Sequence, residues 1–486
     1  MLTGLLIVLP LLAGILLLFT KGKMSGKLAF GFSFIEFLLA IFAWIQYRHN
    51  PDQGMLSLDC TWIESLGVRF SVGIDAMSLL LVLLTSFLVP IIIASSFNSE
   101  YTKPNVFYSL ILFMQMALVG VFVTNDGFLF YIFWELALLP IYFICLLWGG
   151  NDRARITFTF FVYTLLGSLF MLVGLVYLHS HTMVAGNKSW AIADLYEAGQ
   201  KMNVSQQGVV FWLIFIAFAI KMPVFPLHTW QPDTYVVAPT QGTMLLSGIM
   251  LKMGTFGMIK WLMPLCPLAV KEWGSTAMLM AVIGIVYASC IAIVQKDYKR
   301  LIAYSSIAHV GLIAAGIIAF NQQGVQGALM QMFAHGVNVV ALFLIADIIL
   351  RHTGTRELEH LGGIRNVNPL FAVLFLIVVL GAVALPLTNG FVGEFLLITG
   401  VFSFGAWTAA IAGLTIILGA VYMLRSYQAI MLGEANATTN SFGKLSSNDK
   451  ILLVILCGVI LLTGVYPKPL NDLAESAAQT ILMNVK

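Results

Sequence analysis

The chain has 486 residues, of which 60% are hydrophobic and only 10% are charged, with a net charge of +3 at pH 7. Soluble domains carry about 25% charged residues, so this composition excludes a surface solvated mainly by water and predicts one membrane-embedded bundle. The small net charge argues against nucleic-acid binding, and five scattered cysteines without a Cys-x-x-Cys pair argue against an iron–sulfur cluster, a zinc site or a disulfide framework.

Apolar runs recur along the whole chain, and each is long enough to cross a hydrocarbon core of about 30 Å. They are continuously apolar rather than alternating, which predicts an all-α polytopic membrane protein with about 14 transmembrane helices. The predicted spans are 2–19, 28–47, 76–96, 105–124, 126–148, 157–179, 208–230 (interrupted), 241–264, 274–294, 300–319, 325–350, 369–402 (interrupted), 405–431 and 450–466.

The basic residues predict the topology. The first apolar run has no basic residue before it, which favours a retained first helix with its N-terminus outside. Most Lys and Arg residues lie in alternate loops, beginning with the loop at 20–27, so these loops are expected on the cytoplasmic side. The prediction is a multi-pass protein of a bacterial cytoplasmic membrane with both termini on the outer side, in which Lys221 and Lys252 are the basic residues inside helices.

A weak internal repeat divides the chain. Helices 4–8 and 9–13 form two predicted five-helix repeats of opposite orientation, and the fourth helix of each is broken, at 221–226 and at 385–390, by Pro and Gly residues. The predicted regions are 1–104 with helices 1–3, 105–264 with the first repeat (helices 4–8), 265–431 with the second, inverted repeat (helices 9–13), and 432–486 with helix 14 and a tail. Paired broken helices indicate a transport pathway.

Six ionisable residues lie within or beside the predicted spans. A charge at the bilayer centre costs about 2.5–3.5 kcal/mol, so each requires a reason. Four of them fall near the midplane and two lie beside the helix breaks, which together indicates a path for protons. The candidate proton-transfer residues are Glu135, Lys221, Lys252, His309, His335 and Glu394.

The chemistry of these residue types suits proton transfer. Desolvation disfavours the charged form of a carboxylate or lysine, and pairing favours it, so a Glu135–Lys221 pair is predicted to switch between ionised and neutral states. Histidine titrates near neutral pH and can relay protons through water. The alternative for the Glu and Lys residues is a set of static ion pairs that fix helix packing. The alternative for the histidines is a structural hydrogen bond, and for His228 the two readings remain open.

Two acidic residues precede apolar runs. Asp75 and Asp126 are predicted to cap helix N-termini rather than to carry protons, because Asp side chains accept hydrogen bonds from the first free backbone N–H groups of a helix.

Six segments of the chain match a known family: GIDAMS (73–78), FWELALLP (133–140), FAIKMPVFPLHTWQPDTY (218–235), KDYKRLIAYSSIAHVGL (296–312), MFAHGVNVV (332–340) and LPLTNGFVGEF (385–395). They resemble the antiporter-like membrane subunits of respiratory complex I, and the resemblance covers nearly the whole chain. In that family, 14 helices contain two inverted five-helix repeats, whose broken helices and central polar residues are taken to form a proton channel.

The resemblance implies a role for each matching residue. Glu135 and Lys221 match the family's Glu–Lys pair, Lys252 its central lysine, and His309 and His335 the histidines of the second half-channel. The chain is then expected to be a proton-translocating subunit of NADH:quinone oxidoreductase that has no redox centre or cofactor of its own. Flavin, iron–sulfur clusters and quinone are expected in partner subunits. The expected partners are other complex I subunits, especially the L-type and N-type antiporter-like neighbours, together with membrane lipids and protons, and no nucleic acid is expected.

Glu394 distinguishes between the branches of this family. The FVGEF position is glutamate in the M-type branch and lysine in the L-type and N-type branches, and the chain ends soon after its last predicted span, without the long lateral helix of the L-type. Both features favour the M-type branch. Two alternatives remain open: a subunit of an Mrp-type sodium/proton antiporter, where lysine is expected at this position, and a membrane scaffold subunit that conducts nothing.

Overall fold

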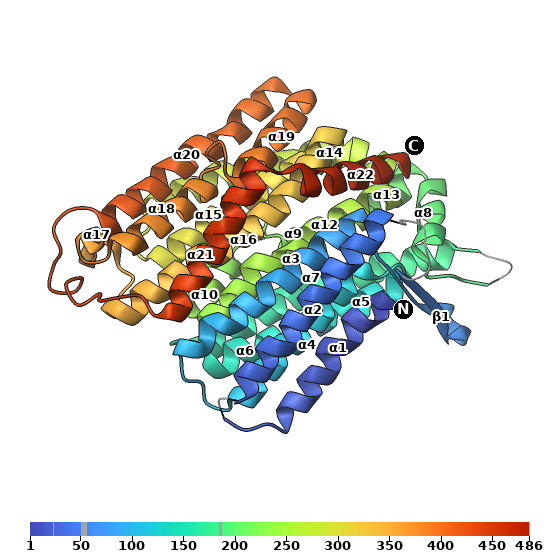
Figure 1. The fold of residues 1–486 in the computed structure, drawn as a ribbon. Helices are drawn as coiled ribbons and strands as arrows, with labels where there is room; N and C mark the ends of the chain where they lie inside the picture. Colours follow the sequence, from blue (N-terminus) through green and yellow to red (C-terminus); the bar gives the residue numbers. More distant parts are fainter. Residues whose placement is uncertain (23, 50–55, 184–186, 486) are drawn as a thin grey trace.

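Almost all of the regular secondary structure is helical. The computed structural model describes residues 1–22, 24–49, 56–183 and 187–485. The helices lie side by side in an elongated bundle, with the N-terminal helices along one side and α18 and α20 along the other (Figure 1). Both termini lie at the same end of the bundle, and the N-terminus lies beside the β-hairpin (Figure 1).

Within the described residues, twelve helical segments are long and apolar enough to cross a membrane. The predicted all-α polytopic fold is therefore confirmed. The count of about 14 is not, because three apolar helices are shorter: α1 (Leu2–Leu18), α18 (Pro369–Ala382) and α19 (Asn389–Phe404). The twelve segments are α2 (Met24–His49), α3 (Ala76–Ser95) with η2 (Ser96–Asn98), α4 (Pro104–Val123), α5 (Gly127–Leu136) with α6 (Leu138–Trp148), α7 (Arg153–His181), α9 (Val204–Lys221), α11 to α13 (Thr240–Leu265), α14 (Pro267–Ile293), α15 (Tyr298–Ile318), α16 (Gln322–Thr353), α20 (Ala406–Met431) and α21 (Ser447–Val465).

Both predicted helix breaks are present. α9 ends at Lys221 and α10 (Trp230–Val237) begins beyond the break, while α18 and α19 are separated by residues 383–388. Prolines within both breaks lack a backbone N–H and prevent continuous helix. The indole N–H of Trp230 donates to the backbone oxygen of Ile220 over 2.9 Å, which satisfies a carbonyl at the end of α9. The inverted relation of the two repeats stays a prediction.

Two further irregularities flank candidate residues. The span at 127–148 is divided into α5 and α6 at Ala137, two residues after Glu135, and the ring of Pro140 crowds the carbonyl four residues before it. In the span at 240–265, α11 (Thr240–Leu245) leads into the π-helical turn η3 (Leu246–Met250), and α12 (Leu251–Gly257) is followed by the π-helical turn η4 (Met258–Leu262) and α13 (Met263–Leu265). Single π-helical turns are frequent at functional sites.

Several elements lie outside the predicted spans. An antiparallel hairpin pairs β1 (Ser57–Ile63) with β2 (Val68–Gly73), with Ser57 opposite Gly73. The turn between the strands contains η1 (Glu64–Leu66) and Gly67, whose φ of 67° favours glycine. The other short helices are α8 (Ile192–Lys201), η5 (Leu358–His360), α17 (Ile364–Val367) and α22 (Lys468–Met483).

The tail after the last predicted span is largely helical, because Lys468–Met483 form α22. Its buried side chains recur at helical spacing and pack the helix against α3 and α16. The opposite face is polar, so the segment has no continuous apolar run and its sequence does not predict a span. The buried residues are Leu470, Leu473, Ala474, Ala477, Ala478 and Ile481.

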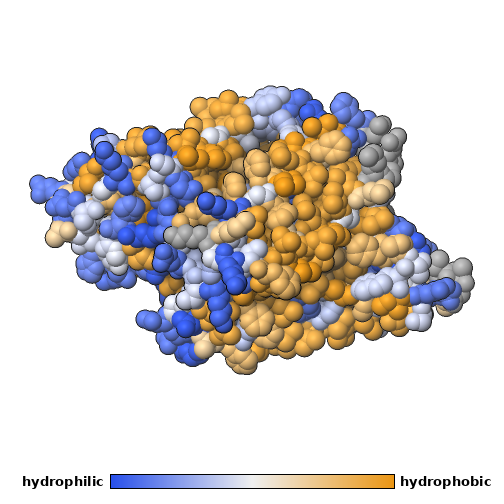
Figure 2. Space-filling model, turned by 60° about the horizontal axis from the view of Figure 1, so that its bottom comes forward, coloured by the Kyte–Doolittle hydropathy of each residue, from blue (hydrophilic) through white to orange (hydrophobic). Residues whose placement is uncertain are grey.

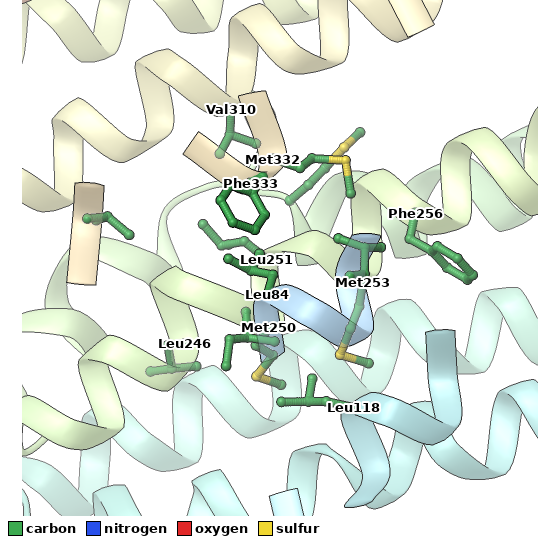
Figure 3. Packing of buried hydrophobic residues seen from close by; sticks show 14 of the residues in the cluster. Leu84, Leu118, Leu246, Met250, Leu251, Met253, Phe256, Val310, Met332 and Phe333 are labelled. Carbon is green, nitrogen blue, oxygen red and sulfur yellow. The ribbon is translucent and has the colours of Figure 1, made fainter. Parts of the chain in front are cut away.

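The surface and the core agree with a membrane environment. Figure 2 shows a broad, continuous hydrophobic surface over the middle of one face, with hydrophilic residues gathered toward the ends of the bundle. At the centre, every residue of the apolar window in Thr240–Leu265 is buried. Figure 3 shows Leu251 and Met253, the chain neighbours of Lys252, packed among apolar residues such as Leu84 and Phe333. The candidate residues near Lys252 therefore lie in an apolar core.

Both predicted helix caps are confirmed. The Asp75 carboxylate accepts the backbone N–H of Ser78 over 2.7 Å at the start of α3. The Asp126 carboxylate accepts the backbone N–H groups of Phe128 and Leu129 over 3.0 and 2.9 Å at the start of α5. A third donor, the backbone N–H of Arg69 in β2, reaches Asp126 over 3.1 Å, so this cap also holds the hairpin to the bundle.

Candidate functional site

Lys252 lies at the centre of a hydrogen-bonded chain. Its side chain is 1% exposed, and its Nζ donates to the backbone oxygen of Ser247, in the π-helical turn, over 2.7 Å. The same Nζ lies 2.9 Å from Nδ1 of His335 on α16, and Nε2 of His335 lies 3.0 Å from the Ser306 hydroxyl on α15. With lysine as donor, Nδ1 of His335 accepts and its Nε2–H can donate to Ser306. This hydrogen-bonded chain links three helices through side chains that can donate and accept protons.

His309 and Glu394 form a second contact. Nδ1 of His309 lies 2.9 Å from Oε1 of Glu394, which is an ion-pair distance, and Glu394 is 1% exposed. The same Oε1 accepts the amide N–H of Gln331 over 3.0 Å. The imidazole is not aligned for a hydrogen bond, and Oε2 of Glu394 has no protein partner. Buried polar atoms without hydrogen-bond partners cost free energy. The unpaired atoms of His309 and Glu394 are therefore placed to bind a water molecule or a proton.

A small polar cavity joins the two contacts. It is lined by residues of α15, α16 and α18, including Ser305, Ser306, His309, Gln331 and His335. Its volume of about 20 Å³ accommodates roughly one water molecule. The imidazole rings of His309 and His335 are 6.2 Å apart between centroids, a separation that one water can bridge. Four of the six predicted residues, Lys252, His309, His335 and Glu394, thus lie in one cluster, which we call the central cluster.

Glu135 and Lys221 lie in a separate group. Lys221 is 2% exposed, and its Nζ lies 5.4 Å from the centroid of the Trp134 ring. The Glu135 carboxyl lies beside Ser168 and interacts electrostatically with Lys221, but one of its oxygens is buried without a hydrogen-bond partner. Both residues are described, and no direct ion pair joins them. Glu135 and Lys221 are therefore neighbours, but their charged groups are not in direct contact.

His228 lies just beyond the first helix break and is 3% exposed. Its ring stacks on Phe225 with centroids 5.7 Å apart and meets Tyr287 edge-on at 5.2 Å. Nδ1 has no hydrogen-bond partner. The aromatic contacts hold the His228 ring in place.

Among the described residues, the sequence analysis missed four buried charged residues: Glu36, Lys260, Lys299 and Asp449. Lys260 and Lys299 are each 4% exposed, so the expectation that Lys221 and Lys252 are the basic residues inside helices is wrong. Lys260 forms an ion pair with Asp75 over 3.0 Å, and Lys299 donates to the backbone oxygen of Ala238 over 2.7 Å. Their positions near the ends of predicted spans made them look like loop residues, because burial there depends on neighbouring helices.

Glu36 is another of the missed residues. It is fully buried on α2, and neither carboxyl oxygen has a hydrogen-bond partner. It falls in the middle of the predicted span 28–47, so the depth criterion applied to Glu135 also identifies it. Within the described part of the chain, no group of three or more His, Cys, Asp or Glu residues is arranged to hold a metal ion.

Comparisons with known proteins agree with this arrangement. The profile of the family described as NADH:quinone oxidoreductase/Mrp antiporter, transmembrane, matches residues 124–419. The NADH-quinone oxidoreductase subunit M of Rickettsia prowazekii is 38% identical, over 98% of both chains. A chain of respiratory complex I from Thermus thermophilus superimposes with a TM-score of 0.89 at 29% identity, covering 99% of this chain and 100% of that one. A chain of the Mrp complex from Dietzia sp. shares the fold, with a TM-score of 0.84 at 19% identity, covering 100% and 99%.

Proposed function

Because the chain belongs to the NADH:quinone oxidoreductase/Mrp antiporter family, we propose that it is the M-type, proton-translocating membrane subunit of an NADH:quinone oxidoreductase. The observation that carries proton transfer is the central cluster, in which Lys252, His335 and Ser306 form a hydrogen-bonded chain beside His309 and Glu394. A static packing role accounts poorly for this cluster, because several of its buried polar atoms have no partner.

The mechanism follows from the two groups of residues. Quinone reduction in partner subunits changes the charge along the membrane arm, and the Glu135–Lys221 gap closes or widens in response. A change in the charge of either residue alters the electrostatic field inside the low-dielectric bundle, where such effects are strong. Lys252 then passes a proton to His335, and water in the cavity carries it to His309 and Glu394 and on to the outer side. Each group returns to its starting state when the next proton arrives.

The partners and placement follow from family membership. This subunit lies between L-type and N-type antiporter-like neighbours, in a bacterial cytoplasmic membrane, with both termini on the outer side. Flavin, iron–sulfur clusters and quinone belong to other subunits. The position of both termini at one end of the bundle supports this topology. Labelling of cysteines introduced at each terminus with a membrane-impermeant reagent in intact cells tests the orientation.

Two other functions make different predictions. A subunit of an Mrp-type antiporter has the same fold, but Glu394 occupies the position where lysine is expected in that family. A scaffold subunit conducts nothing and tolerates loss of the buried charges.

One purification separates the complex from the antiporter. The tagged chain is extracted in mild detergent, and inhibitor-sensitive NADH:quinone activity is measured in the eluate. Co-elution of this activity supports the proposal. Elution with small membrane subunits and no NADH activity contradicts it and favours the antiporter. Full proton pumping by the assembled Lys252→Met variant favours the scaffold.

A further inference from the structure

A hollow opens on the side of the bundle that is predicted to face the cytoplasm. Its volume is about 360 Å³, and its mouth lies between residues 293–296, residues 358–359 and the end of α20. At the mouth, Nζ of Lys296 forms an ion pair with Glu359 over 2.9 Å, and both side chains are well exposed. A hollow with a charged, exposed mouth of this kind admits water.

One face of α20 leads from this mouth into the bundle. Tyr422, Arg425, Ser426 and Ala429 all line the hollow, and their spacing of three and four residues places them on one side of the helix. Tyr422 lies nine residues from the helix end at Met431, which is roughly 14 Å at 1.5 Å per residue. It is therefore the deepest residue of α20 in the hollow.

Tyr422 stands between the hollow and the central cluster. Its side chain is 1% exposed, and its hydroxyl is buried without a well-aligned hydrogen-bond partner. The hydroxyl lies beside that of Ser305 and is close enough to Glu394 to interact electrostatically. Ser305 in turn lines the central cavity, on the same face of α15 as His309, four residues away. Two hydroxyl groups thus separate the water-accessible hollow from the cavity.

The alternative reading is that Tyr422 only fills space. A buried hydroxyl without a partner costs about 1–3 kcal/mol, and a phenyl ring would fill the same volume without this cost. The central cluster also needs a source of protons of its own, because within the described residues no hydrogen bond or ion pair connects it to the Glu135–Lys221 group. These observations favour a functional hydroxyl.

We propose that Tyr422 and Ser305 form a proton-uptake path from the inner hollow to His309 and Glu394, independent of Lys221. The inference rests on the proposed function and supplies protons to its central cluster, so pumping requires this path as well as Lys252. A proton from water in the hollow binds the Tyr422 oxygen as the Tyr422 proton passes to Ser305, and the Ser305 proton passes to the cavity water and on to His309 or Glu394. Both hydroxyl groups are unchanged afterwards, and one proton has moved.

The test uses the whole complex in inside-out vesicles, with assembly checked for every variant. Tyr422→Phe and Ser305→Ala each remove one hydroxyl, and we expect proton pumping to slow by about a hundredfold, the lower end for loss of a positioned proton-transfer group. The matched control is Tyr427→Phe on the same helix. The Tyr427 hydroxyl donates to the backbone oxygen of Ala372 over 3.2 Å, away from the proposed path. The control variant should pump protons at the normal rate.

A second readout distinguishes proton transfer from packing. The ratio of the proton-pumping rate in D₂O to that in H₂O should be lower for Ser305→Ala than for the unmodified complex. The reason is that the remaining proton transfer then limits turnover. Normal pumping by either assembled path variant overturns the inference, and if Tyr422→Phe does not assemble, Ser305→Ala decides. If Glu394→Gln blocks pumping while both path variants pump normally, the path is wrong and the proposed function stands. If Glu394→Gln also pumps normally, the proposed function is wrong as well.

Discussion

Replacement of Lys252 by methionine tests the central cluster most directly. The substitution keeps an unbranched side chain of similar length and removes the ammonium that donates to Ser247 over 2.7 Å and to His335 over 2.9 Å. We expect the complex to assemble and proton pumping to be lost. The reason is that the ammonium is the link between the helix at 240–265 and the His335–Ser306 contact.

The expected magnitudes separate stability from function. Loss of the ammonium leaves two buried acceptors without a donor, at about 1–3 kcal/mol each. It also removes a charge whose burial at the bilayer centre costs about 2.5–3.5 kcal/mol. The two effects largely offset each other, so the free energy of unfolding should change by no more than about 3 kcal/mol. Removal of a positioned proton carrier slows its transfer step by about a hundredfold or more.

The assay compares two lysines of the same span. Lys260→Met is the matched control, because Lys260 is also buried but pairs with Asp75 at the end of α3, outside the central cluster. Coupled NADH:quinone activity, proton pumping and thermal stability are measured for both purified variants. Lys252→Met should lose pumping at near-normal stability, whereas Lys260→Met should keep pumping. Full pumping by assembled Lys252→Met would refute the reasoning.

Three further predictions concern other parts of the structure. Glu135→Gln should suppress coupled NADH:quinone activity without loss of assembly, because the carboxyl forms no direct ion pair; normal pumping would exclude Glu135 from the path. Asp126→Ala should destabilise the N-terminus of α5 by about 1–2 kcal/mol and speed hydrogen exchange in the hairpin, and unchanged exchange would contradict its capping role. Gly393→Ala should destabilise the protein by about 1–3 kcal/mol in thermal unfolding, since the added Cβ would lie 2.8 Å from the backbone nitrogen of Gln331; Gly413→Ala, with open space at its Cβ, is the control.

The sequence alone identified most of the pieces. Continuous apolar runs predicted the spans, Pro and Gly residues predicted both helix breaks, and Asp75 and Asp126 were correctly predicted as caps. The isolated charges inside apolar runs identified all the ionisable members of the central cluster. These features are local, because transfer into a membrane and helix capping depend on residues within one or two turns of each other.

The tertiary structure decided which of these residues meet. Lys252 contacts His335, 83 positions away, while Glu135 and Lys221 remain apart, and no spacing rule within one helix predicts either result. The burial of Lys260 and Lys299 and the packing of α22 likewise depend on neighbouring helices. Hydropathy measures the affinity of each segment for the membrane, whereas contacts between helices depend on which faces pack together. For this reason the sequence determined the list of proton-carrying candidates, and only the packed bundle determined their order.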